Sequence, residues 1–146
     1  MGTVSLPATG LVYVDAQIAI YSADSHPRYA AACAPLWRPG RTVAVSSELT
    51  LLETLVAPLR SGNAQVASRR EDLWRQSNTR LLPITREILR EAARLRALHH
   101  ALKTPDAIHA ATALMHGCAL FVTNDLGFRR IPGLPIVILD TVVDGS

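Results

Sequence analysis

Two kinds of segment alternate along the chain, short apolar runs and longer segments that mix apolar and polar residues. The short runs are rich in β-branched residues and are predicted to be strands, because continuous apolar runs of this length are typical of strands covered on both faces. They are LVYV at 11–14, TVAVS at 42–46, LLPI at 81–84, ALFVT at 119–123 and PIVIL at 135–139. The third run is expected at a sheet edge or a strand start, because Pro83 cannot donate a hydrogen bond to a neighbouring strand.

The segments between these runs have the composition and periodicity of helices. We expect helices over residues 26–37, 48–57, 64–76, 86–102 and 105–116. Ser46 or Ser47 is predicted to cap the second of them, and Pro58 to stop or kink it. Thr104 and Pro105 form a favourable start for the last one, as N-cap and first helical residue.

The alternation of strands and helices predicts an α/β domain with a mostly parallel sheet. The chain has 146 residues, which suggests one domain over residues 1–146. Its hydrophobic fraction of 49% can fill a core without a disulfide or a structural metal. Cys33 and Cys118 lie far apart in apolar settings and form no metal-binding pattern. The last residues, 141–146, are expected to fray.

Charge and hydropathy narrow the class of protein further. No apolar run approaches the roughly 18–20 residues that a membrane span requires. The N-terminal sequence MGTVSLPATG has no basic residue and no long apolar segment, so it does not resemble a secretory signal. A cytoplasmic protein without a membrane partner is therefore expected. The net charge of +3 permits an anionic partner such as nucleic acid without requiring one.

Acidic residues fall at positions that follow the predicted strands. Asp15 directly follows the first run, and Asp125 comes just after the fourth, in VTNDLGF. Glu48 and Glu53 lie on the helix after the second run, and Asp106 opens the helix before the fourth. Functional sites in open parallel sheets form at the carboxyl ends of the strands, so the first three segments are expected to meet at one edge. Asp106 joins them only if helix packing brings it there.

Taken singly, Asp125 and Asp106 have ordinary explanations as a turn or cap residue and a first-turn residue. Glu53 and Asp15 are harder to explain in this way, because Glu53 borders the apolar stripe of its helix and Asp15 has apolar neighbours. Gathered at one edge, however, several carboxylates repel one another and take up protons unless a cation is present. Carboxylate oxygens are hard ligands, which suits Mg²⁺ or Mn²⁺ and does not suit zinc. Such a site is typical of metal-assisted phosphodiester cleavage.

Four motifs, VYVDAQIAIY, SSELTLLETLVAPLRSG, KTPDAIHAATAL and LFVTNDLGF, occur in the order and spacing of a PIN domain. The chain most resembles the VapC-type ribonuclease toxins of bacterial toxin–antitoxin pairs, from about residue 11 to about residue 140. The resemblance implies a three-layer α/β/α fold with a central, mostly parallel sheet of about five strands. It also implies an endoribonuclease dependent on Mg²⁺ or Mn²⁺, which is usually a homodimer and is silenced by a small cognate antitoxin in the active-site groove.

Carried over by motif, the resemblance assigns catalytic and metal-binding roles to four acids, Asp15, Glu53, Asp106 and Asp125. Glu48 precedes the matching position and is expected to be a first-turn charge, although helical geometry alone does not exclude it. Thr123 resembles a supporting polar residue of the family, and Asn124 lies between it and the last acid.

Gln17 is a departure from the family pattern, which often has Asn or another small polar residue two positions after the first Asp. The amide is kept but lies one methylene further out, and errors in groups that orient metal ligands commonly cost about 10–100-fold in affinity or activity. The four acids are intact, which favours an active enzyme. The alternative is a non-catalytic or weakened PIN domain that serves as an RNA- or protein-binding module.

Basic residues are candidates for binding an RNA substrate. Arg129 and Arg130 follow the fourth acid closely and are predicted to contact RNA phosphates. Arg86 and Arg90 share one helix face and are further candidates, although a solvated face is the ordinary explanation for them. His109 lies three residues after the third acid and could approach the site, although a packed or hydrogen-bonded structural residue is the expectation.

Two other enzyme classes that begin with a strand followed by Asp do not fit. A phosphatase of the haloacid dehalogenase type requires a second Asp two positions on, where this chain has Gln17. A receiver domain requires an early acidic pair and a Lys after a late strand, whereas Lys103 precedes a helix. Gln17 and the position of Lys103 therefore argue against these two alternatives to a nuclease.

Overall fold

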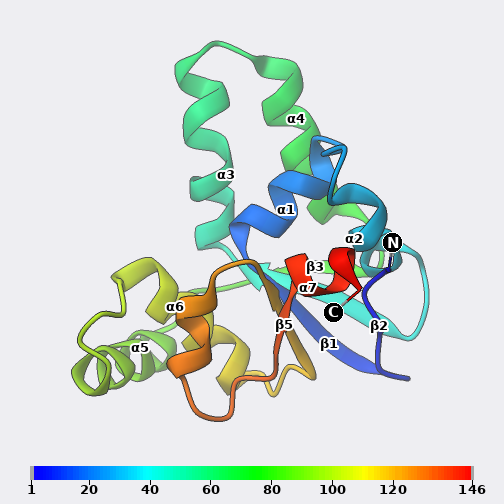
Figure 1. The fold of residues 1–146 in the computed structure, drawn as a ribbon. Coiled ribbons are helices and arrows are strands. Elements are labelled where there is room, and N and C mark those ends of the chain that lie inside the picture. The colour runs from blue at the N-terminus through cyan, green and yellow to red at the C-terminus, as the bar shows by residue number, and fades with distance from the viewer. Residues whose placement is uncertain (1, 146) are drawn as a thin grey trace.

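In the computed structural model, which describes residues 2–145, five parallel strands form one sheet between two layers of helices (Figure 1). The strands are β1 Gly10–Val14, β2 Thr42–Ser47, β3 Thr79–Leu82, β4 Leu120–Thr123 and β5 Ile136–Ile138. Their order is β3-β2-β1-β4-β5, and every neighbouring pair is parallel. The predicted α/β/α class and the parallel five-stranded sheet are therefore confirmed.

Helices connect each strand to the next. They are α1 Ala16–Ala23, α2 Ala30–Trp37, α3 Leu49–Arg60, α4 Ala64–Asp72, α5 Arg86–Leu98, α6 Thr104–Met115 and α7 Leu139–Asp144, with short 3-10 helices η1 Leu73–Arg75 and η2 Leu126–Arg130. Within residues 2–145, every helix is too short or too polar to span a bilayer.

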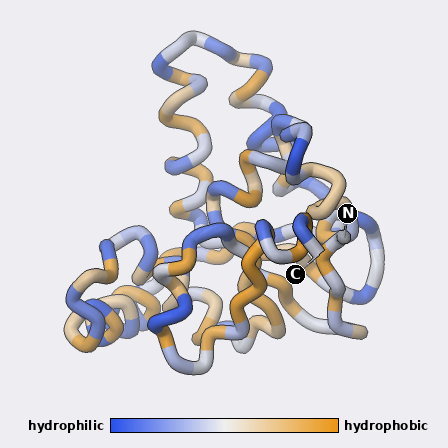
Figure 2. The backbone as a smooth tube through the Cα atoms, in the orientation of Figure 1, coloured by the Kyte–Doolittle hydropathy of each residue, from blue (hydrophilic) through white to orange (hydrophobic). Residues whose placement is uncertain are grey.

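Alternate side chains of the central strands enter two separate cores. Val12 and Val14 of β1 pack with α1, α2 and α7, whereas Tyr13 between them packs with α5 and α6. On β4, Phe121 joins the second core and Val122 the first. Figure 2 shows apolar stretches along the strands and more polar stretches at the loops. The continuous apolar runs of the sequence are thus explained by burial on both faces.

The α3–α4 hairpin projects beyond the sheet (Figure 1). The prediction that Pro58 stops or kinks the helix is wrong as to a stop, because Pro58 lies inside α3, and a kink at Pro58 stays a prediction. The helix continues to Arg60, although Pro58 lacks the N–H that would bond the carbonyl of Thr54. That carbonyl instead accepts a hydrogen bond of 2.8 Å from Nη1 of Arg70 on α4. The same guanidinium donates to both carboxylate oxygens of Asp24, at 3.2 and 2.6 Å. A side chain of α4 therefore replaces the hydrogen bond that the proline removes.

The helix predicted over residues 86–102 ends earlier, at Leu98. Leu102 continues the apolar pattern and is buried, but it lies in the loop that follows. Arg96 closes this loop, because its Nε donates to the carbonyl of Leu102 and its Nη1 to the hydroxyl of Thr104, both at 2.9 Å. The α5–α6 loop is therefore held from the helix that precedes it.

Other boundaries also differ from the prediction. The third strand lies at a sheet edge as expected, but it ends before Pro83 instead of including it. The predicted fraying of residues 141–146 is wrong for the described part, because α7 runs to Asp144 and buries Leu139 and Val143. Ser146 lies outside the described residues. The helix predicted over 26–37 begins at Ala30, and the one over 64–76 divides into α4 and η1.

Candidate active site

The carboxyl ends of β1 and β4 open into a cavity of about 380 Å³ that all four predicted acids line. Asp15 directly follows β1, and Asp125 is the second residue after β4. Glu53 comes from α3, and Asp106 comes from the first turn of α6. Helix packing therefore does bring Asp106 to the other three. The remaining lining residues are Ala16, Gln17, His109, Asn124 and Phe128.

Asp15 caps α1 and is almost completely buried, with 8% of its surface exposed. Its Oδ1 accepts a hydrogen bond from the backbone N–H of Ile18 at 3.1 Å, and its Oδ2 accepts one from the hydroxyl of Thr123 at 2.5 Å. Burial raises the pKa of Asp15 above its ordinary value; these hydrogen bonds oppose the shift, and Asp125 adds to it. The carboxylate is thus firmly oriented at a place that disfavours its charge.

The hydroxyl of Thr123 connects the acids of β1 and β4. It donates to Asp15 and accepts from the backbone N–H of Asp125 at 3.0 Å. Asp125 is itself fixed by the N–H of Gly127, which donates to its Oδ1 at 2.8 Å, so that Asp125 caps η2. A Cβ on Gly127 would lie 3.0 Å from that oxygen, so the glycine leaves room for the carboxylate. Thr123 therefore lies where a supporting polar residue would act.

Asp106 is half-buried, and burial and neighbouring charges change its pKa. Burial raises the pKa of Asp106, the negative charges of Asp125 and Glu53 raise it further, and the positive charge of Lys103 opposes them. As for Asp15, burial is the main cause of the raised pKa, and repulsion from Asp125 adds to it.

Glu53 is the end of a hydrogen-bonded chain that starts in the sheet. Its Oε1 lies 2.6 Å from Nε2 of His109, a residue of α6 that is 2% exposed. Nδ1 of the same imidazole lies 2.6 Å from the hydroxyl of Tyr13 on β1, and that hydroxyl accepts a hydrogen bond of 3.0 Å from the backbone N–H of Ser47.

The direction of each bond in this chain follows from its ends. The amide of Ser47 can only donate, and burial raises the pKa of Tyr13 so strongly that the phenol keeps its hydrogen. Tyr13 therefore donates to Nδ1 of His109, and Nε2 carries the ring hydrogen that is donated to Glu53. His109 is buried and hydrogen-bonded as expected, and it also reaches the site, because it lines the cavity and contacts Glu53. The spacing Asp106-x-x-His109 was the available signal, because residues three apart share a helix face.

The other predicted polar residues divide into those at the cavity and those outside it. Asn124 lines the cavity, and its Oδ1 accepts from the backbone N–H of Asp140 at 2.8 Å, which ties the β4 loop to α7. Gln17 also lines the cavity, but it is exposed and has no side-chain hydrogen bond to any of residues 2–145. Glu48 is exposed and does not line the cavity.

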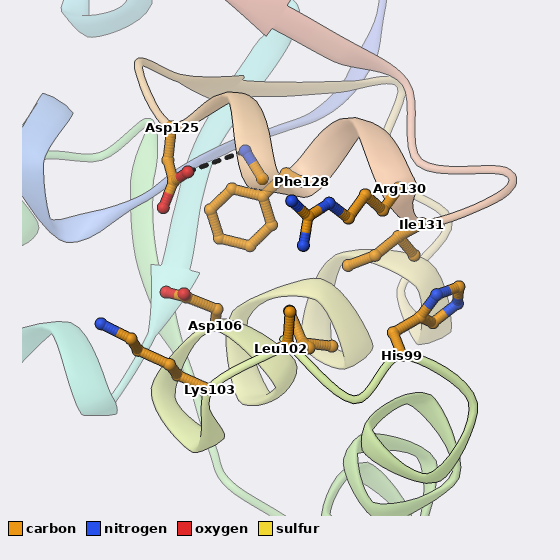
Figure 3. Close-up of a pocket in the computed structure, with 10 residues that line it drawn as sticks. His99, Leu102, Lys103, Asp106, Asp125, Phe128, Arg130 and Ile131 are labelled. Carbon is orange, nitrogen blue, oxygen red and sulfur yellow. Dashed lines mark hydrogen bonds between the residues drawn. The ribbon is translucent and has the colours of Figure 1, made fainter.

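Of the four arginines predicted to contact RNA, only Arg130 is brought near the acids. It lines a second cavity that shares Asp106 and Asp125 with the first (Figure 3). Arg129 is its neighbour on η2 but lines neither cavity, and the same is true of Arg86 and Arg90 on α5.

The donors of the first cavity suit a hard divalent cation, because its acids offer only carboxylate oxygens. Among residues 2–145, no three His, Cys, Asp or Glu side chains stand close enough to form a ready chelate. An ion here would therefore take one or two carboxylates directly and complete its shell with water, which is the usual mode of Mg²⁺. Such an ion would also offset the burial and the repulsion from Asp125 that raise the pKa values of Asp15 and Asp106.

Comparison with protein-family models matches residues 12–134 to the PIN domain. Comparison with curated protein sequences gives no match. Among solved structures, a chain of VapBC2 from Rickettsia felis, bound to a DNA fragment from its promoter, is 18% identical with a TM-score of 0.73, and the match covers 88% of this chain and 98% of that one.

Two further solved structures are similar. A toxin–antitoxin complex from Klebsiella pneumoniae is 27% identical with a TM-score of 0.64, and the match covers 86% of this chain and 95% of that one. VapC20 of Mycobacterium tuberculosis, described as a toxin that cleaves the sarcin–ricin loop, is 18% identical with a TM-score of 0.67, over 82% of this chain and 93% of that one.

Proposed function

The chain belongs to the PIN-domain family, and we propose that it is a metal-dependent endoribonuclease that acts as the toxin of a VapBC-type toxin–antitoxin pair. The observation that carries the proposal is the convergence of Asp15, Glu53, Asp106 and Asp125 on one cavity at the carboxyl ends of the strands. The similar fold of VapC20, described as a toxin that cleaves the sarcin–ricin loop, supports RNA as the substrate class.

Asp15, Asp106 and Asp125, with Glu53, would hold Mg²⁺ or Mn²⁺, some of them through water. When bound, the cation would lower the pKa of a water that attacks the phosphodiester and would stabilise charge on the leaving oxygen. The protein's own contribution is orientation. Two hydrogen bonds fix Asp15, and the imidazole of His109 holds Oε1 of Glu53.

Hydrolysis by water fits this cavity better than attack by a side chain. Its lining includes no Ser or Cys residue. The two cysteines, Cys33 and Cys118, are buried in the cores, and burial raises the pKa of each thiol to about 11, which keeps both unreactive.

The proposed partner is a cognate antitoxin protein, and α3 offers a surface for it. Leu52, Val56 and Leu59 are 60%, 37% and 67% exposed and follow one another along a single stripe of the projecting helix. We define these three residues as the α3 stripe. Exposed apolar patches of this kind often mark protein interaction sites. An antitoxin segment on the α3 stripe would reach the cavity beside Glu53, where a basic side chain could pair with the acids. The family also leads us to propose a homodimer.

Induction of the protein in bacterial cells, followed by sequencing of RNA 5′ ends, tests the proposal. The wild type should arrest growth and create new RNA ends at a defined sequence, and Asp15→Asn should do neither. Identical RNA ends in both cultures would overturn the nuclease assignment. Binding of RNA without metal-dependent cleavage would instead favour the non-catalytic PIN module.

A further inference from the structure

A second cavity, of about 250 Å³, adjoins the acids and lies between the α5–α6 loop and η2 (Figure 3). Asp106, Asp125 and Phe128 line both this cavity and the first one, which we call the acid cavity. We call the second one the side cavity; its other lining residues are His99, Ala101, Leu102, Lys103, Gly127, Arg130 and Ile131. Among these residues, the sequence predicts an RNA contact only for Arg130.

The floor of the side cavity is apolar and rigid. Leu102, Phe128 and Ile131 are 9%, 2% and 3% exposed and belong to the core that covers one face of the sheet. The ring of Phe128 packs on Phe121 of β4 with 4.7 Å between centroids, and Phe121 stacks on Tyr13 at 5.0 Å. The floor is therefore formed by core residues that border the cavity and not by surface side chains.

The rim of the side cavity is cationic. Figure 3 shows the guanidinium of Arg130 directed toward the space between Phe128 and Leu102, while Lys103 extends alongside Asp106. Within residues 2–145, neither Arg130 nor Lys103 forms an ion pair, in contrast to Arg70 and Arg94. Both cations are therefore available to an anion that enters the cavity.

Both walls are held in place by hydrogen bonds of the protein. Arg96 fixes the loop that carries Leu102 and Lys103, through the carbonyl of Leu102 and the hydroxyl of Thr104. On the opposite wall, the carboxylate of Asp125 caps η2 through the N–H of Gly127. A ligand would therefore meet a preformed shape, which reduces the entropy cost of binding.

We propose that the side cavity binds one nucleotide of the RNA, adjacent to the phosphodiester that the acids cleave. Its base would rest on Leu102, Phe128 and Ile131, and its phosphate would contact Arg130, with Lys103 at the shared mouth. The volume lies below the roughly 300–1,000 Å³ of pockets for larger ligands, which suits a single nucleotide. Single-stranded RNA offers this combination of a flat apolar face and an anionic phosphate at every residue. The inference rests on the proposed ribonuclease function and adds the element that selects the cleavage position.

Three variants at exposed positions of the side cavity test this inference. Arg130→Gln and Lys103→Gln remove the cations, and Ala101→Trp fills the cavity from its rim. The matched control is Arg41→Gln, which makes the same charge change at an exposed position outside both cavities.

Binding of nucleoside monophosphates is measured by NMR, through the amide chemical shifts of the full-length protein. The shifts should change at residues 99–103 and 127–131. Arg130→Gln should weaken monophosphate binding about tenfold but leave nucleoside binding unchanged, because a charge-assisted bond is lost. Ala101→Trp should abolish binding of both. Absence of binding, or binding elsewhere, overturns the inference.

RNA binding and cleavage provide the second readout. In an Asp15→Asn background, the slope of log affinity for an RNA oligonucleotide against log salt should fall by about 0.7 for each cation removed, and the control should keep the full slope. In the active protein, Arg130→Gln should raise KM about tenfold and spread the cleavage positions. If the wild type cleaves RNA but all three variants match Arg41→Gln, the inference fails and the nuclease assignment stands. If monophosphates occupy the side cavity but no RNA is cleaved, the nuclease assignment fails and the binding site stands.

Discussion

Nε2 of His109 lies 2.6 Å from Oε1 of Glu53 and ties this acid of the cavity to the interior of the protein. The imidazole is in turn held by Tyr13 of β1, which is itself anchored on the backbone of β2. Glu53 stands on a helix that projects from the sheet, so its position would otherwise depend on the helix alone. The chain of bonds aligns the α3 acid with those of β1 and β4.

Replacement of His109 should therefore weaken metal binding through Glu53 and leave the positions of the other three acids unchanged. His109→Leu removes both bonds, and we expect the Mg²⁺ concentration for half-maximal cleavage to rise about 10–100-fold. His109→Gln keeps a donor for Glu53 and should recover most of this loss. Mn²⁺ binding to the purified variants measures the effect without catalysis.

The matched control for this experiment is His116→Leu, at the exposed C-terminal end of the same helix. It should leave metal binding unchanged. Equal Mn²⁺ affinity of wild type and His109→Leu would show that His109 does not position Glu53 for metal binding.

Much of this architecture could be predicted from the sequence, because it depends on local patterns. The five apolar runs are strands because each is buried on both faces, and the acids at strand ends meet because parallel strands end at one edge. The resemblance to the family's motifs also assigned Asp106 and Glu53 to the predicted site. Both lie in the acid cavity, as the resemblance implied.

Features that depend on contacts between distant segments could not be predicted. Pro58 signals a helix end, and only Arg70 of α4 explains why the helix continues. The apolar residues Ala101 and Leu102 predict a longer helix, but they lie in a loop that Arg96 holds through the carbonyl of Leu102. The side cavity exists because that loop faces η2, and no local pattern records the pairing.

Asp15→Asn should stabilise the metal-free protein while it abolishes activity. Because burial raises the folded pKa of Asp15 above its ordinary value of 3.8, ionisation of this group destabilises the folded state. The penalty is absent below the unfolded pKa, grows as pH rises through the folded pKa, and is complete above it. Asparagine removes the charge and can still cap α1.

Thermal unfolding without metal measures this effect. The midpoint of Asp15→Asn should exceed that of the wild type at pH 7–8, by roughly 2–4 °C for each kcal/mol relieved, and the difference should vanish toward pH 4. Glu48→Gln, which neutralises an exposed carboxylate outside the cavity, should show no such pattern. A destabilised Asp15→Asn protein at every pH would contradict the account of Asp15.

Arg70 and Pro58 should be energetically coupled through the carbonyl of Thr54. Arg70→Ala leaves this carbonyl without its donor, and we expect it to lower the free energy of unfolding by about 1–3 kcal/mol. The same substitution should cost less in a Pro58→Ala background, because the new N–H of Ala can bond Thr54 within the helix. Urea unfolding of the four proteins gives the coupling energy.

An exposed arginine provides the comparison for this cycle. Arg75 forms ion pairs with Glu71 and Asp72, but its side chain is 70% exposed. Arg75→Ala should therefore cost at most about 1 kcal/mol, with no dependence on residue 58. If Arg70→Ala costs the same in both backgrounds, the guanidinium does not compensate for the proline.

The α3 stripe should be needed for antitoxin binding and not for catalysis. We expect the double variant Leu52→Ser, Leu59→Ser to lose the co-expressed cognate antitoxin during purification, because the apolar contact area is removed. The variant should still cleave RNA with Mg²⁺. Leu98→Ser changes an equally exposed leucine at the end of α5 and should retain the antitoxin. Retention of the antitoxin by the double variant would place its binding site elsewhere.

The most direct measurement of the central claim is RNA cleavage by the purified protein as a function of Mg²⁺ concentration, with Asp106→Asn and Glu48→Gln beside the wild type. Our account predicts that the wild type and Glu48→Gln cleave RNA only with Mg²⁺ or Mn²⁺ and stop when EDTA is added. Asp106→Asn should be at least about 100-fold slower at every metal concentration. Cleavage that persists in EDTA, or an Asp106→Asn rate equal to that of the wild type, would contradict a metal-dependent nuclease built on these four acids.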